Sequence, residues 1–250
     1  MQAVFSRGIS AHEKKFRDKY HLAGYTDKTA PLIMFSVFKK EDYHIYLGHE
    51  GKLIVVWCGS DSLKINNKRA KLLKSREAKH IATHDFGSRD LKKYSIQHEI
   101  IPITPLSPET NIVPNGDSLY FYTNIKRDGF YGDGFITGIK RKTGLSINIT
   151  DKSMYNRNQL KKIYSKCFLG LRLTRHDGVP TTVLELGMMG RKSLFNGSVP
   201  HNIHWRGIDD ICESIMKEYD RRKEDNSQIA IDIKKFLDIG DDWMAAQGLS

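Results

Sequence analysis

The sequence predicts an α/β protein made of two small domains, each built on a parallel β-sheet. Three observations predict this class. Short apolar runs rich in β-branched and aromatic residues alternate with segments of helical period. The stretch 104–117, TPLSPETNIVPNGD, carries three of the seven prolines and separates two such alternating halves. The length of 250 residues fits one large or two small domains, and either buries a real core.

The elements follow from the pattern in each half. In the first half, strands are expected at 31–38, 52–58, 79–83 and 97–103, and helices at 64–78 and 86–95. In the second half, strands are expected at 118–123, 145–149, 167–173 and 192–196, and helices at 131–141, 156–165 and 181–189. Segments 207–222 and 227–247 are typical of closing helices. We therefore expect a trimmed N-terminal domain at 1–104, a linker at 105–117 and a second domain at 118–250, with ligands bound in a cleft beyond the carboxyl ends of the strands.

Composition limits the function classes. Lys and Arg outnumber Asp and Glu by 40 to 29, which gives a net charge of +11. Such a balance favours a polyanion, a phosphorylated substrate or an anionic membrane surface as partner, although solubility alone also requires net charge. No run of 18 apolar residues exists and the start lacks a signal-peptide core, so no transmembrane segment is expected, while peripheral membrane contact stays open. The three cysteines are far apart and odd in number, which predicts buried free thiols and a cytoplasmic location.

The most informative segment is 166–197, where a buried strand ends in a polar turn that leads into a helix. Pro180 is expected in the first helical turn, where its missing N–H costs nothing. Thr181 and Thr182 place unpaired backbone N–H groups at the helix start, which with the helix dipole form a phosphate site. Glu185 lies one turn further along, where a carboxylate can accept two ribose hydroxyls; an exposed helix carboxylate is the plainer alternative.

This segment resembles the donor-binding half of GT-B glycosyltransferases, in particular the retaining group marked by two acidic residues separated by seven. The pair here is Asp177 and Glu185, with GVPTTVL between them, and Asp177 replaces the usual Glu. The resemblance covers about 118–200. It implies Glu185 on the nucleotide ribose, Asp177 near the donor sugar and the Thr181 and Thr182 amides on the diphosphate, with Gly178 as a further donor-binding residue.

The resemblance also implies basic side chains that bind the diphosphate. Lys126 and Arg127 follow the strand 118–123 and fit this need, without the family's usual spacing, and solvated charge in a turn is the alternative. Arg172 and Arg175 are the other candidates, and Arg175 lies in the same turn as Asp177.

In the first half, KLIVVWCGSDSL places Gly59, Ser60 and Asp61 at the tip of a strand. This loop is similar to the one that faces the cleft in many GT-B enzymes, although Trp57 and Cys58 stand where a histidine is expected. Asp61 is either a cleft acid with a catalytic role or a helix cap. His84, after the next strand, is more often structural in such a position.

The densest charge lies at 64–79, with seven Lys or Arg and one Glu. On a helix this pattern gives a buried stripe and a broad basic face, which is either a solvated surface or an acceptor patch that includes Lys68, Arg69 and Lys71. The run GDGFITG at 132–138 imitates a dinucleotide-binding loop, but it lies too far from its strand, so we expect no nicotinamide cofactor.

The leading hypothesis is a glycosyltransferase that moves a sugar from a nucleotide sugar, such as a UDP or GDP sugar, to a hydroxyl of a glycan. Amides, a helix dipole and cations can stabilise the leaving diphosphate, and no Asp-x-Asp pair stands at a suitable strand end, so we expect neither a metal nor another cofactor. Retention of configuration follows only from the resemblance. The alternatives are a small, basic, viral-type transferase acting on modified bases of DNA, and a non-catalytic basic α/β module that binds nucleic acid.

Overall fold

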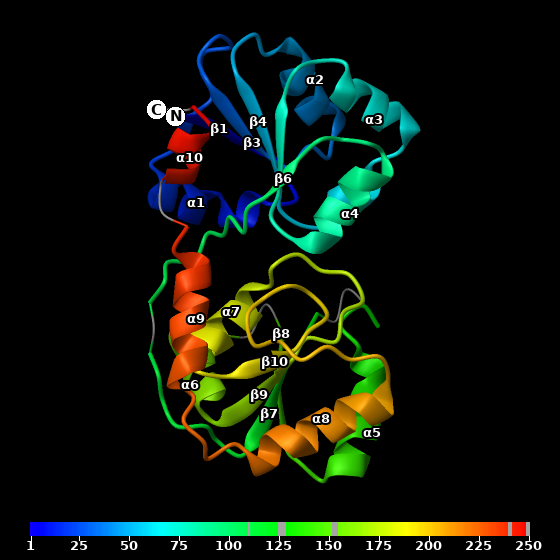
Figure 1. The fold of residues 1–250 in the computed structure, drawn as a ribbon, viewed down its shortest axis with the longest axis vertical. Helices are drawn as coiled ribbons and strands as arrows, with labels where there is room; N and C mark the ends of the chain where they lie inside the picture. The colour runs from blue at the N-terminus through cyan, green and yellow to red at the C-terminus, as the bar shows by residue number, and fades with distance from the viewer. Residues whose placement is uncertain (110, 125–128, 152–154, 240–241, 249–250) are drawn as a thin grey trace. The chain divides into compact units, whose positions relative to one another are not determined.

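The structure is a computed structural model that describes residues 1–250 except 110, 125–128, 152–154, 240–241 and 249–250. The chain forms two compact α/β units (Figure 1). The first unit comprises Met1–Ser107, Asp177–Val179 and Leu237–Ser250, and the second comprises Pro108–His176 and Pro180–Phe236.

The first unit is built on a six-stranded sheet of order β2-β1-β3-β4-β5-β6, in which every pairing is parallel. Its strands are β1 (Gln2–Phe5), β2 (Ala23–Gly24), β3 (Leu32–Phe35), β4 (Leu53–Trp57), β5 (Lys79–Ala82) and β6 (Glu99–Ile100). Its helices are η1 (Ser10–His12), α1 (Glu13–Tyr20), α2 (Lys40–Gly48), η2 (Ser62–Lys64), α3 (Asn67–Lys74), α4 (Asp85–Lys93) and α10 (Asp242–Ala246).

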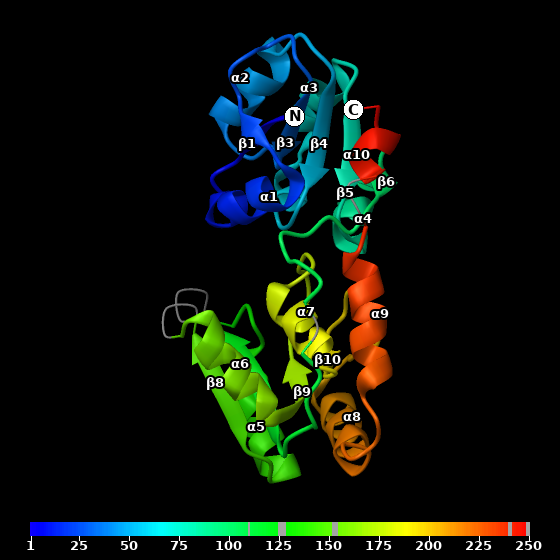
Figure 2. The same cartoon turned by 90° about the vertical axis from the view of Figure 1, so that its left-hand side faces the viewer.

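Two apolar layers hold this sheet in place. Central strands β3 and β4 are buried along their whole length because helices cover both faces, as expected for a parallel sheet. Helices α2, α3 and α4 pack on one face and α1 with α10 on the other (Figure 1), while β1, β3, β4 and β5 lie side by side (Figure 2).

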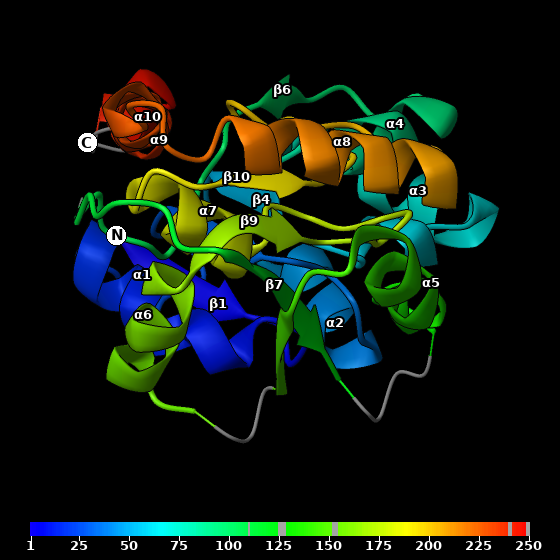
Figure 3. The same cartoon turned by 90° about the horizontal axis from the view of Figure 1, so that it is seen from below.

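The second unit contains a parallel sheet of order β10-β9-β7-β8. Its elements are β7 (Ser118–Thr123), α5 (Asp133–Thr143), β8 (Ile147–Asp151), α6 (Arg157–Ser165), β9 (Cys167–Leu171), α7 (Thr181–Met188), β10 (Lys192–Leu194), α8 (Ile208–Asp220) and α9 (Ser227–Leu237). Helices α5 and α8 cover one face of the sheet, and α6 and α7 cover the other (Figure 3).

The predicted α/β class with two parallel sheets is confirmed, and the differences lie in particular elements. Strands β1 and β2 and helices α1 and α2 were not expected, because the first 30 residues show no long apolar run and α2 begins with the charged residues Lys40–Asp42. The expected strand at 97–103 is reduced to the edge strand Glu99–Ile100. The single closing helix expected at 227–247 is two helices, α9 and α10.

The end of the chain differs from the expected domain division. Residues 237–250 were expected in the second domain, but Leu237–Ser250 belong to the first unit. The physical reason is Trp243, which is buried against the first sheet and meets the Tyr20 ring edge-on at 5.8 Å between centroids.

Strand order places one ligand-binding position on each sheet. In the second unit the chain continues from β7 to β8 on one side of the sheet and from β9 to β10 on the other. The strand order therefore reverses between the neighbouring strands β7 and β9. In the first unit the same reversal occurs between β1 and β3. Open parallel sheets bind ligands beyond the carboxyl ends of the strands at such reversals. Within the described residues, no helix is long and apolar enough to cross a membrane.

Candidate active site

The β9–α7 connection lies at the reversal point of the second sheet. The strand ends at Leu171, and the polar turn that follows leads to Pro180, the residue that caps α7. Pro180 thus precedes the first helical turn instead of lying in it, with φ −69° and ψ 129°. The backbone N–H groups of Thr181 and Thr182 fall in the first turn of α7, where an α-helix has no internal acceptors. This helix start can accept an anion.

Glu185 lies one turn inside α7 and is largely buried, with its side chain 16% exposed. The hydroxyl of Tyr164, from α6, donates a hydrogen bond of 3.1 Å to Glu185 Oε2, and Arg157 Nε lies 4.0 Å from Oε1. Burial raises the pKa of Tyr164, so its hydroxyl stays protonated and remains a donor. The carboxylate is therefore held in one orientation by α6.

The pocket beside Glu185 is nearly closed. It is lined by Glu109, Asn111, Arg157, Lys161, Tyr164, Glu185, Met188 and Met189, and its free volume is about 20 Å³. That volume holds one water and not a ribose. A ribose fits beside Glu185 only if lining side chains move, and Arg157 and Glu109, whose side chains are 46% and 67% exposed, have room to swing into solvent. No sequence motif pointed to Arg157 or Tyr164, although the Asn156–Gln159 capping box marks Arg157 as the first residue of α6.

The four basic candidates of the second unit have different environments. The Arg172 guanidinium lies over the rings of Tyr131 and Tyr122, 4.6 and 5.2 Å from their centroids, so it is held against β7. Arg175 is exposed in the turn after β9. Lys126 and Arg127 lie outside the described residues.

The glycine run at 132–138 takes part in the same edge of the sheet. Gly132 has φ +85°, and a Cβ there would lie 2.5 Å from the Cβ of Leu173, so this loop packs directly on the turn after β9. Asp133 begins α5 and accepts a hydrogen bond from the Thr123 hydroxyl at the end of β7. Asp133 was not among the predicted site residues, because the glycine run was not expected to bind a dinucleotide; its position as the first residue of a helix was the available signal.

In the first unit, the predicted loop Gly59–Asp61 follows β4, with Ser60 exposed. Asp61 is buried, and its Oδ1 accepts a hydrogen bond of 2.9 Å from the Gly59 N–H. Burial raises the pKa of the Asp61 carboxyl. Asp61 occupies the N-cap position of the short helix Ser62–Lys64 without a capping hydrogen bond from its side chain, so its position fits the cap interpretation and its role as a cleft acid stays a prediction. His84 is a buried helix cap, because its Nδ1 accepts the Gly87 N–H at 3.0 Å.

Asp177–Val179 group with the first unit. A Cβ on Gly178 would lie 2.9 Å from the carbonyl oxygen of Cys58 and 3.4 Å from the Cα of Gly59. Two segments that the sequence singled out separately, the acidic turn and the Gly59–Asp61 loop, are thus neighbours within this unit. Asp177 Oδ1 accepts the Gly178 N–H at 2.9 Å, which shapes the turn.

The reversal point of the first sheet contains residues that sequence analysis missed because it did not predict β1. Asp42 Oδ2 accepts hydrogen bonds from the Ser6 hydroxyl at 2.7 Å and from the Phe38 and Lys39 N–H groups at 2.8 Å, and so joins the loops after β1 and β3. Arg7 is exposed in the loop after β1, beside Gly8, around which a Cβ would meet nothing. Arg7 therefore lies in an open loop at the carboxyl end of β1.

The basic side chains of segment 64–79 have different environments. Arg69 is tied to its own surroundings, because it donates to the Lys64 carbonyl at 2.8 Å and lies over the Tyr43 ring. Lys68 is exposed. Lys71 lines a groove along α3 together with residues that end α4.

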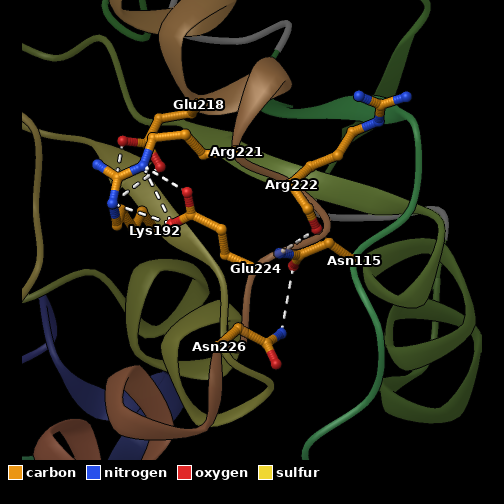
Figure 4. Close-up of polar contacts among 7 residues, drawn as sticks. All are labelled: Asn115, Lys192, Glu218, Arg221, Arg222, Glu224 and Asn226. Carbon is orange, nitrogen blue, oxygen red and sulfur yellow. Dashed lines mark hydrogen bonds and ion pairs between the residues drawn. The ribbon is translucent and has the colours of Figure 1, made fainter.

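Figure 4 shows a charged cluster of the second unit. It includes Lys192, the first residue of β10, and so lies at the amino edge of the sheet. Its charges are paired: Lys192 with Glu218 at 2.9 Å and Arg221 with Glu224 at 3.0 Å. Asn115 donates to the Arg222 carbonyl and accepts from Asn226, which fastens the segment entering β7 to the α8–α9 connection. These contacts hold the two segments together, and we call the seven residues labelled in Figure 4 the clamp.

Among the residues that the structure describes, no group of three His, Cys, Asp or Glu side chains is placed to hold a metal ion. All three cysteines are free thiols; Cys167 and Cys212 are buried, as predicted, and Cys58 is partly exposed.

No protein-family model and no curated protein matches the sequence. Solved structures resemble the fold. A mutant of Staphylococcus aureus TarM, in a complex with fondaparinux, alpha-GlcNAc-glycerol and UDP, superposes with a TM-score of 0.59 at 8% identity over 89% of this chain and 55% of that one. The lipopolysaccharide outer core galactosyltransferase WaaB gives a TM-score of 0.61 at 13% identity, covering 97% of this chain and 81% of that one.

Sucrose-phosphate synthase from Thermosynechococcus elongatus gives a TM-score of 0.59 at 10% identity, covering 94% of this chain and 74% of that one. The chain spans about half the length of the TarM structures it matches. At these identities the likeness concerns the fold, which is the GT-B arrangement of two parallel-sheet α/β domains.

Proposed function

We propose that this protein is a metal-independent glycosyltransferase that moves a sugar from a nucleotide sugar to a hydroxyl of a glycan with retention of configuration. The observation that carries the proposal is the β9–α7 connection: a helix start able to accept an anion and an oriented carboxylate, Glu185, at the reversal point of the second sheet. The GT-B fold supports it.

The chemical task is to break the bond between the anomeric carbon and the diphosphate, whose negative charge grows in the transition state. In the proposed mechanism the Thr181 and Thr182 amides and the dipole of α7 bind that charge, assisted by Arg175. Because these groups are fixed before the reaction, they stabilise the leaving group without reorganisation. Lys126 and Arg127 remain candidates for the same role.

Glu185 is assigned to the ribose, because a buried, charged acceptor held by Tyr164 offers strong bonds to hydroxyl donors. Asp177 is assigned to the transferred sugar. Asp61 is assigned to the acceptor side: its raised pKa makes it a better proton acceptor once ionised than an ordinary aspartate.

The test is a screen of UDP, GDP and ADP by thermal shift, followed by mass spectrometry of the matching nucleotide sugars with and without EDTA. We expect one nucleotide to stabilise the protein and its sugar conjugate to be hydrolysed or transferred equally in EDTA. Loss of turnover in EDTA would overturn metal independence. No stabilisation by any nucleotide would instead support the non-catalytic nucleic-acid-binding module.

A further inference from the structure

The surface groove along α3 concentrates positive charge from two helices. It has a volume of about 560 Å³ and is lined by Asn67, Ala70, Lys71, Lys74, Ser75, Lys93, Tyr94 and Ser95. Asn67, Lys71 and Lys74 share one face of α3 because they are four and three positions apart. Lys93 comes from the last turn of α4.

The lysines of this groove are not neutralised. Within the described part of the chain, Lys71, Lys74 and Lys93 form no ion pair, and no acidic side chain lines the groove. Some lysines of the same unit are paired, as in Lys28 with Glu50 and Lys79 with Glu99, and other described ones, such as Lys15 and Lys68, are not. What distinguishes the groove is that three unpaired lysines gather in it. Lys74 Nζ donates to the Tyr94 carbonyl at 3.2 Å, which joins the ends of the two helices.

A plainer explanation accounts for each lysine singly, because cations in the last turn of a helix interact favourably with its dipole. It does not explain why the ends of two helices bring three lysines to one groove that no acidic side chain lines. Binding of an anion would relieve the mutual repulsion of these lysines.

We propose that this groove binds the acceptor, and that the acceptor is a linear polymer with repeating phosphates and no bases. This assignment deepens the proposed function and rests on it. Lysine ammonium groups suit phosphate as point charges, whereas carboxylate polymers are better matched by the planar fork of arginine, which is absent from the described lining. The only ring in that lining, Tyr94, is half-buried with Lys93 Nζ 5.7 Å from its centroid, so successive bases find no stacking platform.

An acceptor held in this groove must be an extended molecule. In a parallel α/β unit the crossover helix starts at the carboxyl edge of the sheet and ends at the amino edge, so the groove leads away from the edge that holds Gly59–Asp61. The eight residues of α3 cover about 12 Å. A ligand that fills the groove and reaches the reacting edge therefore spans several repeat units.

The experiment measures fluorescence anisotropy of labelled polyphosphate, a base-free phosphate chain, across a salt series, with Lys71→Gln/Lys93→Gln as the test variant. Lys14→Gln/Lys15→Gln, exposed on α1, is the matched control because it removes the same charge elsewhere. We expect the test variant to bind about 10-fold more weakly and to lower the slope of log K against log salt by about one to two, with the control changed less than about twofold.

Equal weakening of polyphosphate binding in both variants would show that net charge alone sets the affinity, and would contradict the proposed groove. Two competitors test the chemistry. Hyaluronate displacing polyphosphate at equal charge would overturn phosphate selectivity, and an oligothymidylate of equal charge binding 10-fold more tightly would favour nucleic acid instead. Nucleotide thermal shifts on the same variants separate the two proposals. If nucleotides still raise the melting temperature but the test variant binds polyphosphate as tightly as the wild type, the groove proposal is wrong and the transferase proposal stands. If polyphosphate binds but no nucleotide raises the melting temperature, the transferase proposal is wrong.

Discussion

At the residue scale, the candidate site depends on side chains whose chemistry is set by their neighbours. Glu185 owes its orientation to Tyr164 and faces Arg157, and Asp61 owes its raised pKa to burial. Each environment gives a measurable expectation.

Replacing Glu185 by Gln should weaken nucleotide binding strongly, because hydrogen bonds to a charged acceptor contribute roughly 1.5–3 kcal/mol each. Gln keeps an acceptor for the Tyr164 hydroxyl, so the variant should fold. Isothermal titration with the best nucleotide checks this. Glu109→Gln is the matched control, since Glu109 lines the same pocket. Unchanged affinity in folded Glu185→Gln would remove Glu185 from the site.

Replacing Asp177 by Asn should lower turnover more than free-nucleotide affinity, because the proposed contact of Asp177 is to the transferred sugar. Steady-state transfer rates and nucleotide titration on one preparation give the comparison. A parallel loss of nucleotide affinity would contradict the division of roles between Asp177 and Glu185.

Asp61 should make stability fall as pH rises. Its folded-state pKa is raised above the ordinary value of 3.8, so above that value the unfolded chain releases a proton that the folded protein retains. The stabilisation is complete below pH 3.8 and is lost as pH rises through the folded pKa. Asp61→Asn should thus be more stable than the wild type at pH 7.5, with the gap closing at pH 4. Denaturant melts at both values test this, and a gap that is constant with pH would contradict it.

At the element scale, one buried side chain fastens the segment that enters the second sheet. Arg191 is 1% exposed and donates to five backbone carbonyls, among them Val113, Pro114 and Cys167. Burial lowers its pKa to about 10, which still leaves it charged at neutral pH. The clamp of Figure 4 holds the same segment from outside.

Arg191→Met should destabilise the second unit by about 3 kcal/mol or more, because buried carbonyls left without donors cost about 1–3 kcal/mol each. Urea denaturation measures the loss, and hydrogen exchange should show it first at 113–116. Arg221→Gln, whose partner is exposed, should cost under about 1 kcal/mol. Similar losses in the two variants would show that the buried contacts of Arg191 add nothing special.

At the scale of the whole molecule, each unit has its own apolar core, and the chain returns to the first core at its end. The residues of α10 are therefore distant in sequence from the sheet they cover. This arrangement makes the two ends of the chain part of one folding unit.

Trp243→Ala should destabilise the first unit by about 3–5 kcal/mol, as large-to-small changes in a core do. Hydrogen exchange should accelerate in β1 and α1, and protection of β9 should stay unchanged. Ile231→Ala, 53% exposed on α9, is the control with little expected effect. Equal acceleration in β9 would show that the two units unfold as one.

The sequence by itself determined the strands whose local pattern is strong. Leu32–Phe35, Leu53–Trp57, Ser118–Thr123 and Cys167–Leu171 are apolar runs with turn signals, so hydrophobic burial fixes them without help from distant residues. The helix start after β9 and the position of Glu185 on it were predicted for the same reason.

Tertiary structure alone decided what depends on contacts between distant segments. β1 is four residues long and half-buried, and it is a strand because Gln2–Phe5 pairs in register with Leu32–Phe35. Trp243 joins the first core, and Lys71 and Lys93 meet at one groove, only because packing brings separate elements together. Local periodicity indicates whether a segment favours a helix or a strand and which of its faces is apolar. It contains no information on which distant surface that element buries or which charges it gathers.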